Sequence, residues 1–318
     1  MFAIDVNHLS KRFGDFQAIT DLSFSVQDGE TFGFLGPNGA GKTTTIRILT
    51  GISSPSEGEA SIFGLDIVKD TIAAKKMMGI VPETSNVYDD LSAWRNLMFS
   101  AELYGIAKNV REKRGQELLE LFGLWARKDD KARGYSKGMK RRLTLAMGLI
   151  NEPRLLFLDE PTSGLDVQSN LIIRDVIRDL NSRKVTVFLT THNIEEANLV
   201  CDRVAIVNRG RIAAIDSPEK LKGTIQSVQS VEVAFDRSSS DMIDALRRID
   251  RVSEVRKEGD KFRLYTEDPA TVMVQLMEYS KVHANRIVTM NTFGPSLEDV
   301  FIKLTGLELN AKGVRTVD

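Results

Sequence analysis

The feature that most constrains this chain is a glycine-rich run that fits the pattern G-x-x-x-x-G-K-[ST]. It covers Gly36 to Thr43 and lies between an apolar run at 31–35 and a helical run at 45–49. A loop between a strand and a helix can turn successive backbone N–H groups toward one anion, and the positive end of the helix dipole points at the same place. The sequence therefore predicts an α/β domain that binds the phosphates of a nucleotide.

The loop residues differ in the contacts expected of them. Lys42 has the length and charge to reach the β- and γ-phosphates, and the Thr43 hydroxyl is suited to Mg²⁺. The alternative is a glycine-rich turn that binds nothing, and the flanking strand and helix patterns argue against it. The residues expected to surround the phosphates are Gly36, Pro37, Asn38, Gly39, Ala40, Gly41, Lys42, Thr43 and Thr44.

Two acidic residues at the end of a second apolar run complete the expected site. Asp159 and Glu160 directly follow Leu155–Leu158. Asp159 is expected to hold Mg²⁺, and Glu160 to polarise a water in line with the γ-phosphate. With the glycine-rich loop, the two carboxylates predict binding and hydrolysis of a nucleoside triphosphate. The Asn-Lys-x-Asp run by which a GTPase reads guanine does not occur in the sequence.

The pattern around these motifs predicts one α/β domain over residues 1–225. Apolar residues alternate from Ile4 to about Phe34, which predicts several short strands, partly antiparallel. Helical spacing follows from Leu91 to about Leu124. Short apolar runs at 155–158 and 185–189 are typical of buried parallel strands, with a helix over 169–180 between them. The domain is thus expected to have an antiparallel β part and a helical part.

A polar, small-residue stretch before residue 231 predicts a boundary, and a second domain is expected over 231–318. Its pattern has the order β-α-β-β-α-β, which is ferredoxin-like. A closing helix is expected from Ser296, with Asp299 at capping-box spacing. The sequence assigns no chemistry to this domain. The expected strands are 231–236, 252–257, 261–266 and 285–291, and the expected helices are 240–249 and 269–281.

Composition excludes several classes of protein. Lys and Arg number 43 against 44 Asp and Glu, so the net charge of -1 gives no reason to expect a nucleic-acid partner. The single cysteine, Cys201, cannot form an internal disulfide, which suits a reducing cytosol. The start lacks the pattern of a signal peptide. No run of 18 apolar residues occurs, because charged residues interrupt every candidate, so no segment is expected to cross a bilayer. No direct membrane insertion is expected.

Further motifs follow the glycine-rich loop in a fixed order. They are Tyr135-Ser136-Lys137-Gly138-Met139, then Ser163-Gly164-Leu165-Asp166, then Thr190-Thr191-His192. With this series the chain resembles the ATP-binding subunit of an ABC transporter over roughly residues 1–220. In the order given, the three motifs look like that family's signature, its D-loop and its switch histidine. Phe13 lies where that family places an aromatic that stacks on adenine.

The resemblance implies a P-loop ATPase of the ABC class whose signature acts across a dimer. Ser136 and Gly138 would cap the γ-phosphate held by Lys42 of a second copy, so that ATP joins two copies head to tail. His192 would contact the γ-phosphate and steady the attacking water beside Glu160. The alternatives are a structural histidine at a strand end for His192 and a core aromatic for Phe13.

Two departures from the family pattern affect the expected site. The signature is usually Leu-Ser-Gly-Gly-Gln, whereas this chain has other residues in the first, third and fifth places. Glu83, after a strand at 79–81, stands where the family has a Gln that touches Mg²⁺, and a carboxylate can still approach the metal. The basic residues near the signature, Lys137, Lys140, Arg141 and Arg142, are expected to form a solvated helix face.

The Tyr-Ser-Lys-Gly-Met form and the run Phe293–Phe301 narrow the resemblance to the daunorubicin-resistance type of exporter ATPase. That type implies an ATP- and Mg²⁺-dependent ATPase on the cytoplasmic face of the cell membrane, which works with a separate multi-span permease. One alternative is a soluble ABC-type ATPase acting on ribosomes or DNA, which usually has two nucleotide domains in one chain. The other is a small-molecule kinase with the same phosphate-binding loop, which would not need Ser136 and Gly138 together with His192. The transported substrate is not readable from these residues.

Overall fold

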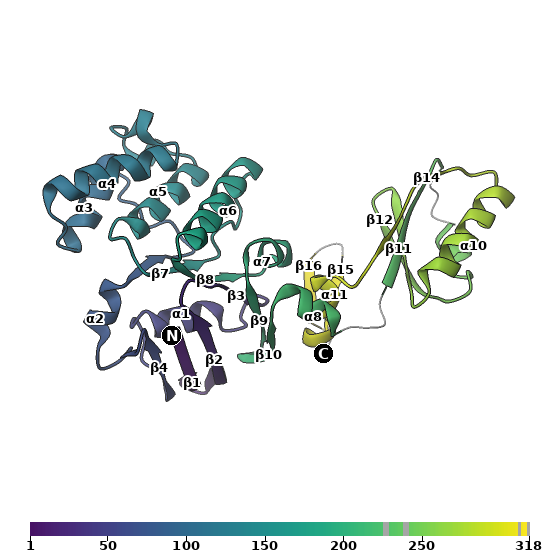
Figure 1. Cartoon of the computed structure of the whole chain (residues 1–318), viewed down its shortest axis with the longest axis horizontal. Helices are drawn as coiled ribbons and strands as arrows, with labels where there is room; N and C mark the ends of the chain where they lie inside the picture. The colour runs from purple at the N-terminus through teal and green to yellow at the C-terminus, as the bar shows by residue number, and fades with distance from the viewer. Residues whose placement is uncertain (225–228, 238–241, 311–312, 317–318) are drawn as a thin grey trace. The chain divides into compact units, whose positions relative to one another are not determined.

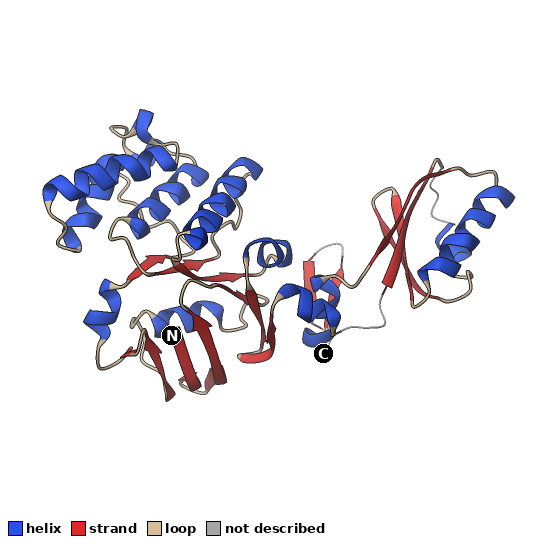
Figure 2. Ribbon diagram, viewed as in Figure 1, coloured by secondary structure: helices blue, strands red, loops and turns tan. Residues whose placement is uncertain are grey.

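The computed structural model describes residues 1–224, 229–237, 242–310 and 313–316. The chain divides into two compact units, Met1–Pro218 and Glu219–Asp318, and each is described by itself. In the first unit two sheets and a group of helices are arranged around the glycine-rich loop (Figures 1 and 2). In the second unit a smaller antiparallel sheet has its own core.

The central sheet of the first unit has six strands in the order β10-β9-β3-β8-β7-β6. All are parallel except β10, which runs antiparallel to β9. Every residue of β3, β7 and β8 is buried, which explains why these strands are continuous apolar or Thr-containing runs without alternation. The strands are β3 (Thr31–Leu35), β6 (Met78–Val81), β7 (Leu155–Asp159), β8 (Thr186–Thr191), β9 (Arg203–Asn208) and β10 (Arg211–Asp216).

The second sheet is antiparallel, in the order β2-β1-β4-β5. Its strands are β1 (Phe2–Phe13), β2 (Phe16–Gln27), β4 (Glu57–Ile62) and β5 (Leu65–Asp66). The prediction of several strands, partly antiparallel, before Phe34 is confirmed, but β1 and β2 are longer than expected, at twelve residues each. Their pairing shifts register at several points, and each shift interrupts the apolar alternation that a sequence pattern can follow.

Helix α1 packs between the two sheets, whereas α3, α4, α5 and α6 lie on the side of the central sheet away from the antiparallel sheet (Figure 1). Several start with a side-chain cap, where an oxygen of Ser92, Ser136, Asp166 or Asn193 accepts a backbone N–H three residues on. The helices are α1 (Lys42–Leu49), α2 (Thr71–Lys76), α3 (Ala93–Leu103), α4 (Lys108–Leu121), α5 (Lys137–Leu149), α6 (Val167–Ser182) and α7 (Ile194–Val200), with single 3₁₀ turns at Trp125–Arg127 and Ala132–Gly134.

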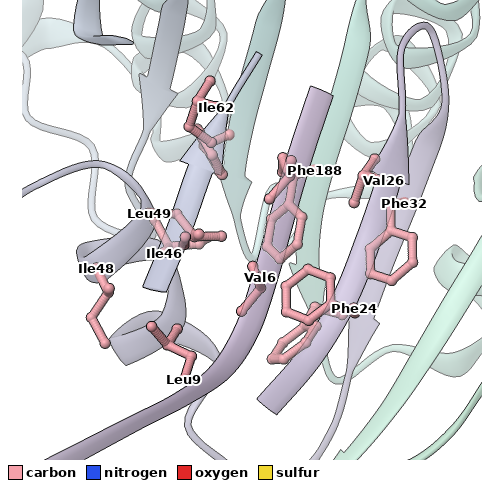
Figure 3. Close-up of a cluster of buried hydrophobic side chains, with 14 of the residues drawn as sticks. Val6, Leu9, Phe24, Val26, Phe32, Ile46, Ile48, Leu49, Ile62 and Phe188 are labelled. Carbon is pink, nitrogen blue, oxygen red and sulfur yellow. The ribbon is translucent and has the colours of Figure 1, made fainter. Parts of the chain in front are cut away.

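Aromatic rings fill the space between the two sheets (Figure 3). Phe24 of β2 stacks on Phe32 of β3, with 5.6 Å between ring centroids. Phe188 of β8 lies 5.9 Å from Phe32 and 5.5 Å from Phe157 of β7. All four side chains are buried. This core therefore fixes the spacing of β3, β8 and β7, the strands whose ends carry the predicted site.

The second unit has the ferredoxin-like arrangement that the sequence predicts. Its sheet has the order β12-β13-β11-β14, with every neighbouring pair antiparallel. The first helix is shorter than expected and ends at Leu246, because the chain turns at 247–251 to enter β12; residues 240 and 241 lie outside the described residues. The elements are α8 (Pro218–Gly223), β11 (Gln229–Phe235), α9 (Met242–Leu246), β12 (Val252–Glu258), β13 (Lys261–Thr266), α10 (Pro269–Val282) and β14 (Ile287–Phe293).

The closing helix α11 (Leu297–Thr305) begins as predicted at a capping box. The Ser296 hydroxyl accepts the Asp299 N–H, and the Asp299 carboxylate accepts the Ser296 N–H, at 3.1 and 2.9 Å. The helix ends at Gly306, whose φ of 65° is the left-handed conformation common at helix ends. A hairpin of β15 (Leu307–Asn310) and β16 (Gly313–Thr316), which the sequence did not predict, follows.

The aromatic core generates a stability prediction. Phe188→Ala should lower the free energy of unfolding by about 3–5 kcal/mol, because the cavity left among Phe32 and Phe157 cannot close. Urea denaturation of the full chain measures the loss. Phe2→Ala is the matched control, since that ring is 44% exposed and should cost about 1 kcal/mol or less. Equal losses in the two variants would contradict the assignment of the core.

Candidate functional site

The predicted phosphate- and metal-binding residues, with Glu160 and His192, come from the carboxyl edge of the central sheet. Parallel strands β3, β6, β7 and β8 all end there, so the segments that follow them meet at one place. A cavity of about 370 Å³ opens at this edge. Its lining residues are Phe16, Ala18, Asn38, Gly39, Gly41, Lys42, Thr43, Thr44, Glu83 and Glu160.

Close backbone packing holds the glycine-rich loop in place. A methyl group on Gly36 would lie 2.4 Å from the carbonyl oxygen of Val207, so no larger residue fits there without a shift of β9. Gly41 has a φ of 99° and caps α1, which begins at Lys42. The start of this helix thus faces the cavity, where its backbone N–H groups suit an anion.

Lys42 and Glu160 form an ion pair inside the cavity. The ammonium nitrogen lies 3.2 Å from Oε1 of Glu160, and the two side chains are only 6% and 7% exposed. The ammonium also donates to the carbonyls of Gly36 and Pro37, at 2.7 and 3.1 Å. A buried ammonium with these partners is stable only while an anion stays beside it. The structure therefore brings together the predicted phosphate-binding lysine and the predicted base.

Asp159 and Thr43 lie side by side beneath this pair. The Thr43 hydroxyl donates to Oδ1 of Asp159 at 3.3 Å, and the Thr190 hydroxyl donates to the same oxygen. Oxygen ligands of this kind suit Mg²⁺, which usually takes one or two carboxylates and completes its shell with water and substrate phosphates. Among the described residues no group of three or more His, Cys, Asp or Glu is placed to hold a metal. The oxygens of Thr43 and Asp159 fit Mg²⁺ as ligands.

Glu160 has an unusual backbone and a second charged partner. Its φ of 47° is left-handed, and its N–H donates to the backbone carbonyl and the hydroxyl of Thr190. Oε2 lies 2.8 Å from Nδ1 of His192, which follows the end of β8. Burial by itself raises the pKa of Glu160, but the hydrogen bond from His192 and the charge of Lys42 hold that pKa below its ordinary value. The carboxylate is therefore ionised.

The same contact acts on the histidine in the opposite direction. The hydrogen bond to Glu160 raises the pKa of His192, against the lowering effects of partial burial and of Lys42. The imidazole is half exposed. It lies between the Glu160 carboxylate and solvent.

The structure distinguishes two aromatics at the β1–β2 turn. Phe16 lines the cavity, whereas Phe13 is not among its lining residues. Phe13 is 50% exposed, with the Lys11 ammonium 4.9 Å from its ring centroid, so the core interpretation of Phe13 is wrong. Stacking of Phe13 on adenine stays a prediction, and Phe16 is a candidate for the same contact that the sequence motif did not indicate.

Ser136 and Gly138 stand at the start of α5, apart from this cavity. Ser136 is exposed and caps the helix by accepting the Met139 N–H at 3.2 Å. Gly138 is buried where a methyl group would lie 2.3 Å from the Ser169 hydroxyl of α6. Among the described residues, those lining the Lys42 cavity do not include Ser136 or Gly138. Within one chain the signature is therefore not part of the cavity.

The expected solvated face of basic residues on α5 is wrong for Arg141, and Arg142 is only partly exposed. Arg141 is 3% exposed, and Arg142 donates to the carbonyl of Phe122 at 2.8 Å. Arg141 shares a helix face with Gly138, Leu145 and Gly148, all buried, at spacings of three and four residues. That spacing is the sequence signal that could have identified Arg141 as a buried residue. Thr190 had no such signal, because its role depends on which strand lies beside β7.

The whole chain is similar to curated export and resistance proteins. The Nod factor export ATP-binding protein I of Rhizobium sp. (strain N33) is 38% identical over 307 residues, which cover 96% of this chain and 98% of the relative. The linearmycin resistance ATP-binding protein LnrL of Bacillus subtilis (strain 168) is 33% identical over 308 residues, covering 96% and 99%. A family model described as ABC transporter matches residues 19–163. The chain belongs to the ATP-binding subunits of ABC transporters.

Solved structures agree in fold. An ATP-binding subunit of an ABC transporter superposes with a TM-score of 0.65 at 28% identity, over 70% of this chain and 93% of the other. The dimeric ATP-binding cassette MJ0796 bound to ADP and Pi superposes at 0.62 and 23% identity, over 67% and 98%. The chain is an ATP-binding ATPase of the ABC class. Among the described residues no helix is long and apolar enough to cross a membrane.

The contact between His192 and Glu160 generates a pH prediction. Since folding raises the pKa of His192, the stability gained from its charge is complete below about pH 6.5 and is lost as the pH rises through the raised value. A titration of the histidine resonances by NMR should place the pKa of His192 above its ordinary value, and Glu160→Gln should lower it.

Asp21→Asn provides the control for this titration. It removes a carboxylate 2.7 Å from another imidazole, that of His8, and should leave the titration of His192 unchanged. An equal pKa of His192 in the wild type and in Glu160→Gln would contradict the pairing.

Proposed function

We propose that this chain is the ATP-hydrolysing subunit of an exporter, which drives transport through a separate membrane-spanning permease. The observation that carries the proposal is the match over 96% of the chain to a protein named for Nod factor export. The name of the linearmycin resistance protein points the same way, since export is a common route to resistance. Because the two relatives are named for different molecules, we assign the choice of cargo to the permease.

We propose that Lys42 changes partners when ATP enters the cavity. In the structure its ammonium neutralises Glu160 and bonds the carbonyls of Gly36 and Pro37. The β- and γ-phosphates of ATP would draw the ammonium away, with the loop residues 36–44 enclosing them. Loss of the Lys42 charge raises the pKa of Glu160 and makes it a stronger base, because that charge is one of the influences that lower the pKa.

Glu160 then accepts a proton from the attacking water. His192 holds the carboxylate through Oε2, which leaves Oε1 to face the water once Lys42 has moved. We assign His192 the further role of contacting the γ-phosphate from its half-exposed position. Phe13 or Phe16 would stack on the adenine.

Thr43, Asp159 and Glu83 are the proposed ligands of Mg²⁺. Thr43 and Asp159 already lie in hydrogen-bond contact, and Glu83 lines the same cavity from the end of β6. When bound, Mg²⁺ would neutralise charge that develops on the phosphate oxygens. Thr190 positions Asp159 by donating to Oδ1.

The exposed start of α5 supports a head-to-tail dimer. Ser136 and Lys137 are exposed there, and they lie outside the cavity that holds Lys42. We propose that Ser136 and the backbone at Gly138 cap the γ-phosphate bound to a second copy, which gives two equivalent sites related by two-fold symmetry. ATP binding closes the dimer, and hydrolysis reopens it and moves the attached permease. Because ATP is a cytoplasmic fuel, we propose that the subunit works on the cytoplasmic face of the cell membrane.

The first prediction from this proposal concerns turnover. Glu160→Gln should reduce ATP hydrolysis by at least about 100-fold, because an amide cannot accept the proton of the attacking water. The variant should still bind ATP and form an ATP-stabilised dimer, as measured by size-exclusion chromatography with light scattering. Hydrolysis near the wild-type rate would rule out Glu160 as the base. Glu196→Gln, a change at a buried glutamate of α7 that lies outside the cavity, is the matched control.

The same variant tests the transporter role. Tagged Glu160→Gln, incubated with ATP and Mg²⁺ and detergent-solubilised native membranes, should recover a multi-span membrane protein. Recovery of ribosomal or DNA-repair proteins alone would overturn the transporter role and leave the ATP site as described. Omission of ATP provides the control, because only the closed dimer is expected to hold its partner firmly.

The second prediction concerns the shared site. Ser136→Arg should abolish ATP-dependent dimerisation of the Glu160→Gln chain, because a large cation replaces the hydroxyl that faces the second copy. Its affinity for ATP as a monomer should stay within about twofold of the parent, since Ser136 lies outside the Lys42 cavity. Equilibrium binding of a fluorescent ATP analogue measures that affinity. An equal loss of monomer affinity would contradict a site shared between copies.

A further inference from the structure

Arg141 is a buried cation that none of the roles above uses. It lies on α5, one turn past Ser136, and only 3% of its surface is exposed. Its guanidinium donates to backbone carbonyls on two separate segments of the chain. Nε bonds Pro161 at 3.0 Å, Nη2 bonds Asp159 at 2.7 Å and Glu160 at 3.2 Å, and Nη1 bonds Pro82 and, at 3.1 Å, Glu83.

The chemistry of the guanidinium explains why this arrangement is specific. Burying a cation costs free energy unless its N–H donors have hydrogen-bond partners. All three nitrogens of Arg141 donate hydrogen bonds to backbone carbonyl oxygens. Burial lowers the pKa of Arg141 to about 10, while Asp159, Glu196, Glu83 and Glu160 favour the charged form. The side chain is thus a cation at neutral pH. A lysine ammonium is a single point of donation and cannot reach both segments at once.

The two segments are the continuations of neighbouring strands. The β6–β7 ladder ends at the pair Val81 and Leu158. Beyond that pair the chains carry Pro82 and Glu83 on one side and Asp159, Glu160 and Pro161 on the other. The guanidinium bonds both continuations where strand pairing has stopped. It also fixes the carbonyl of Glu160, whose left-handed φ of 47° needs support from its surroundings.

We infer that Arg141 is a positioning residue for ATP hydrolysis. Its one guanidinium holds the backbone of Glu83 and the backbone of Glu160 in fixed positions relative to each other. Because Arg141 belongs to α5, a shift of that helix is transmitted to both segments through the same side chain. The effect on turnover rests on the proposed role of Glu160. The mechanical link between the two segments is independent of that role.

Arg141→Lys and Arg141→Gln test the link in the full chain. Both should lower kcat for ATP by about 10- to 100-fold and leave KM within about threefold, because the cavity residues that hold ATP remain while the base is displaced. Lysine should not rescue the rate, since charge without the planar fork does not bond both segments. Hydrogen–deuterium exchange of the nucleotide-free protein should speed up in residues 82–86.

Arg142→Lys and Arg142→Gln are the matched controls, one residue along the same helix. Arg142 donates to Phe122 at the end of α4, so its variants should leave both kcat and exchange at 82–86 within about twofold. A wild-type kcat with unchanged exchange in the Arg141 variants would overturn the inference. An equal loss of kcat in the Arg142 variants would also overturn it, because the effect would then be a general loosening of α5. Faster exchange with a normal kcat would keep the mechanical link and overturn the role of Arg141 in ATP hydrolysis.

Discussion

A buried pair of opposite charges determines how the rest of the site is arranged. Lys42 and Glu160 come from segments that follow β3 and β7, and β8 lies between those strands in the sheet. Neither charge is stable alone in an environment that excludes almost all water. Each accordingly has further partners, the carbonyls of Gly36 and Pro37 for the ammonium and His192 for the carboxylate. The requirement to keep both charges satisfied holds the two loops close together.

The parts of the site that the sequence could predict are those whose geometry follows from spacing within one segment. The glycine-rich loop predicts that a helix starts directly after it, and α1 does start at Lys42. A carboxylate after an apolar run predicts the end of a strand, and β7 does end at Asp159. Which residues meet across segments could not be predicted. The selection of Phe16 rather than Phe13 for the cavity wall depends on how the hairpin of β1 and β2 turns.

The fold shows the same division between local and non-local information. Continuous apolar runs predicted β3 and β7 within one residue, since burial on both faces leaves a clear pattern. Register shifts concealed the length of β1 and β2. Arg141 was expected at the surface because four basic residues lie close together in sequence, yet its helix face carries Gly138, Leu145 and Gly148. Helical periodicity would have been the better guide there than charge.

The pairing of β3 has a consequence for how the chain reaches its folded state. Thr31 of β3 pairs with Val187 of β8, and Phe32 pairs with Arg203 of β9. A chain leaving the ribosome has therefore made most of its first unit before β3 finds either neighbour. Contacts so distant in sequence slow folding and leave apolar strands exposed meanwhile. The glycine-rich loop that begins at the end of β3 gains its structural support late, so ATP is expected to bind only after the first unit is almost complete.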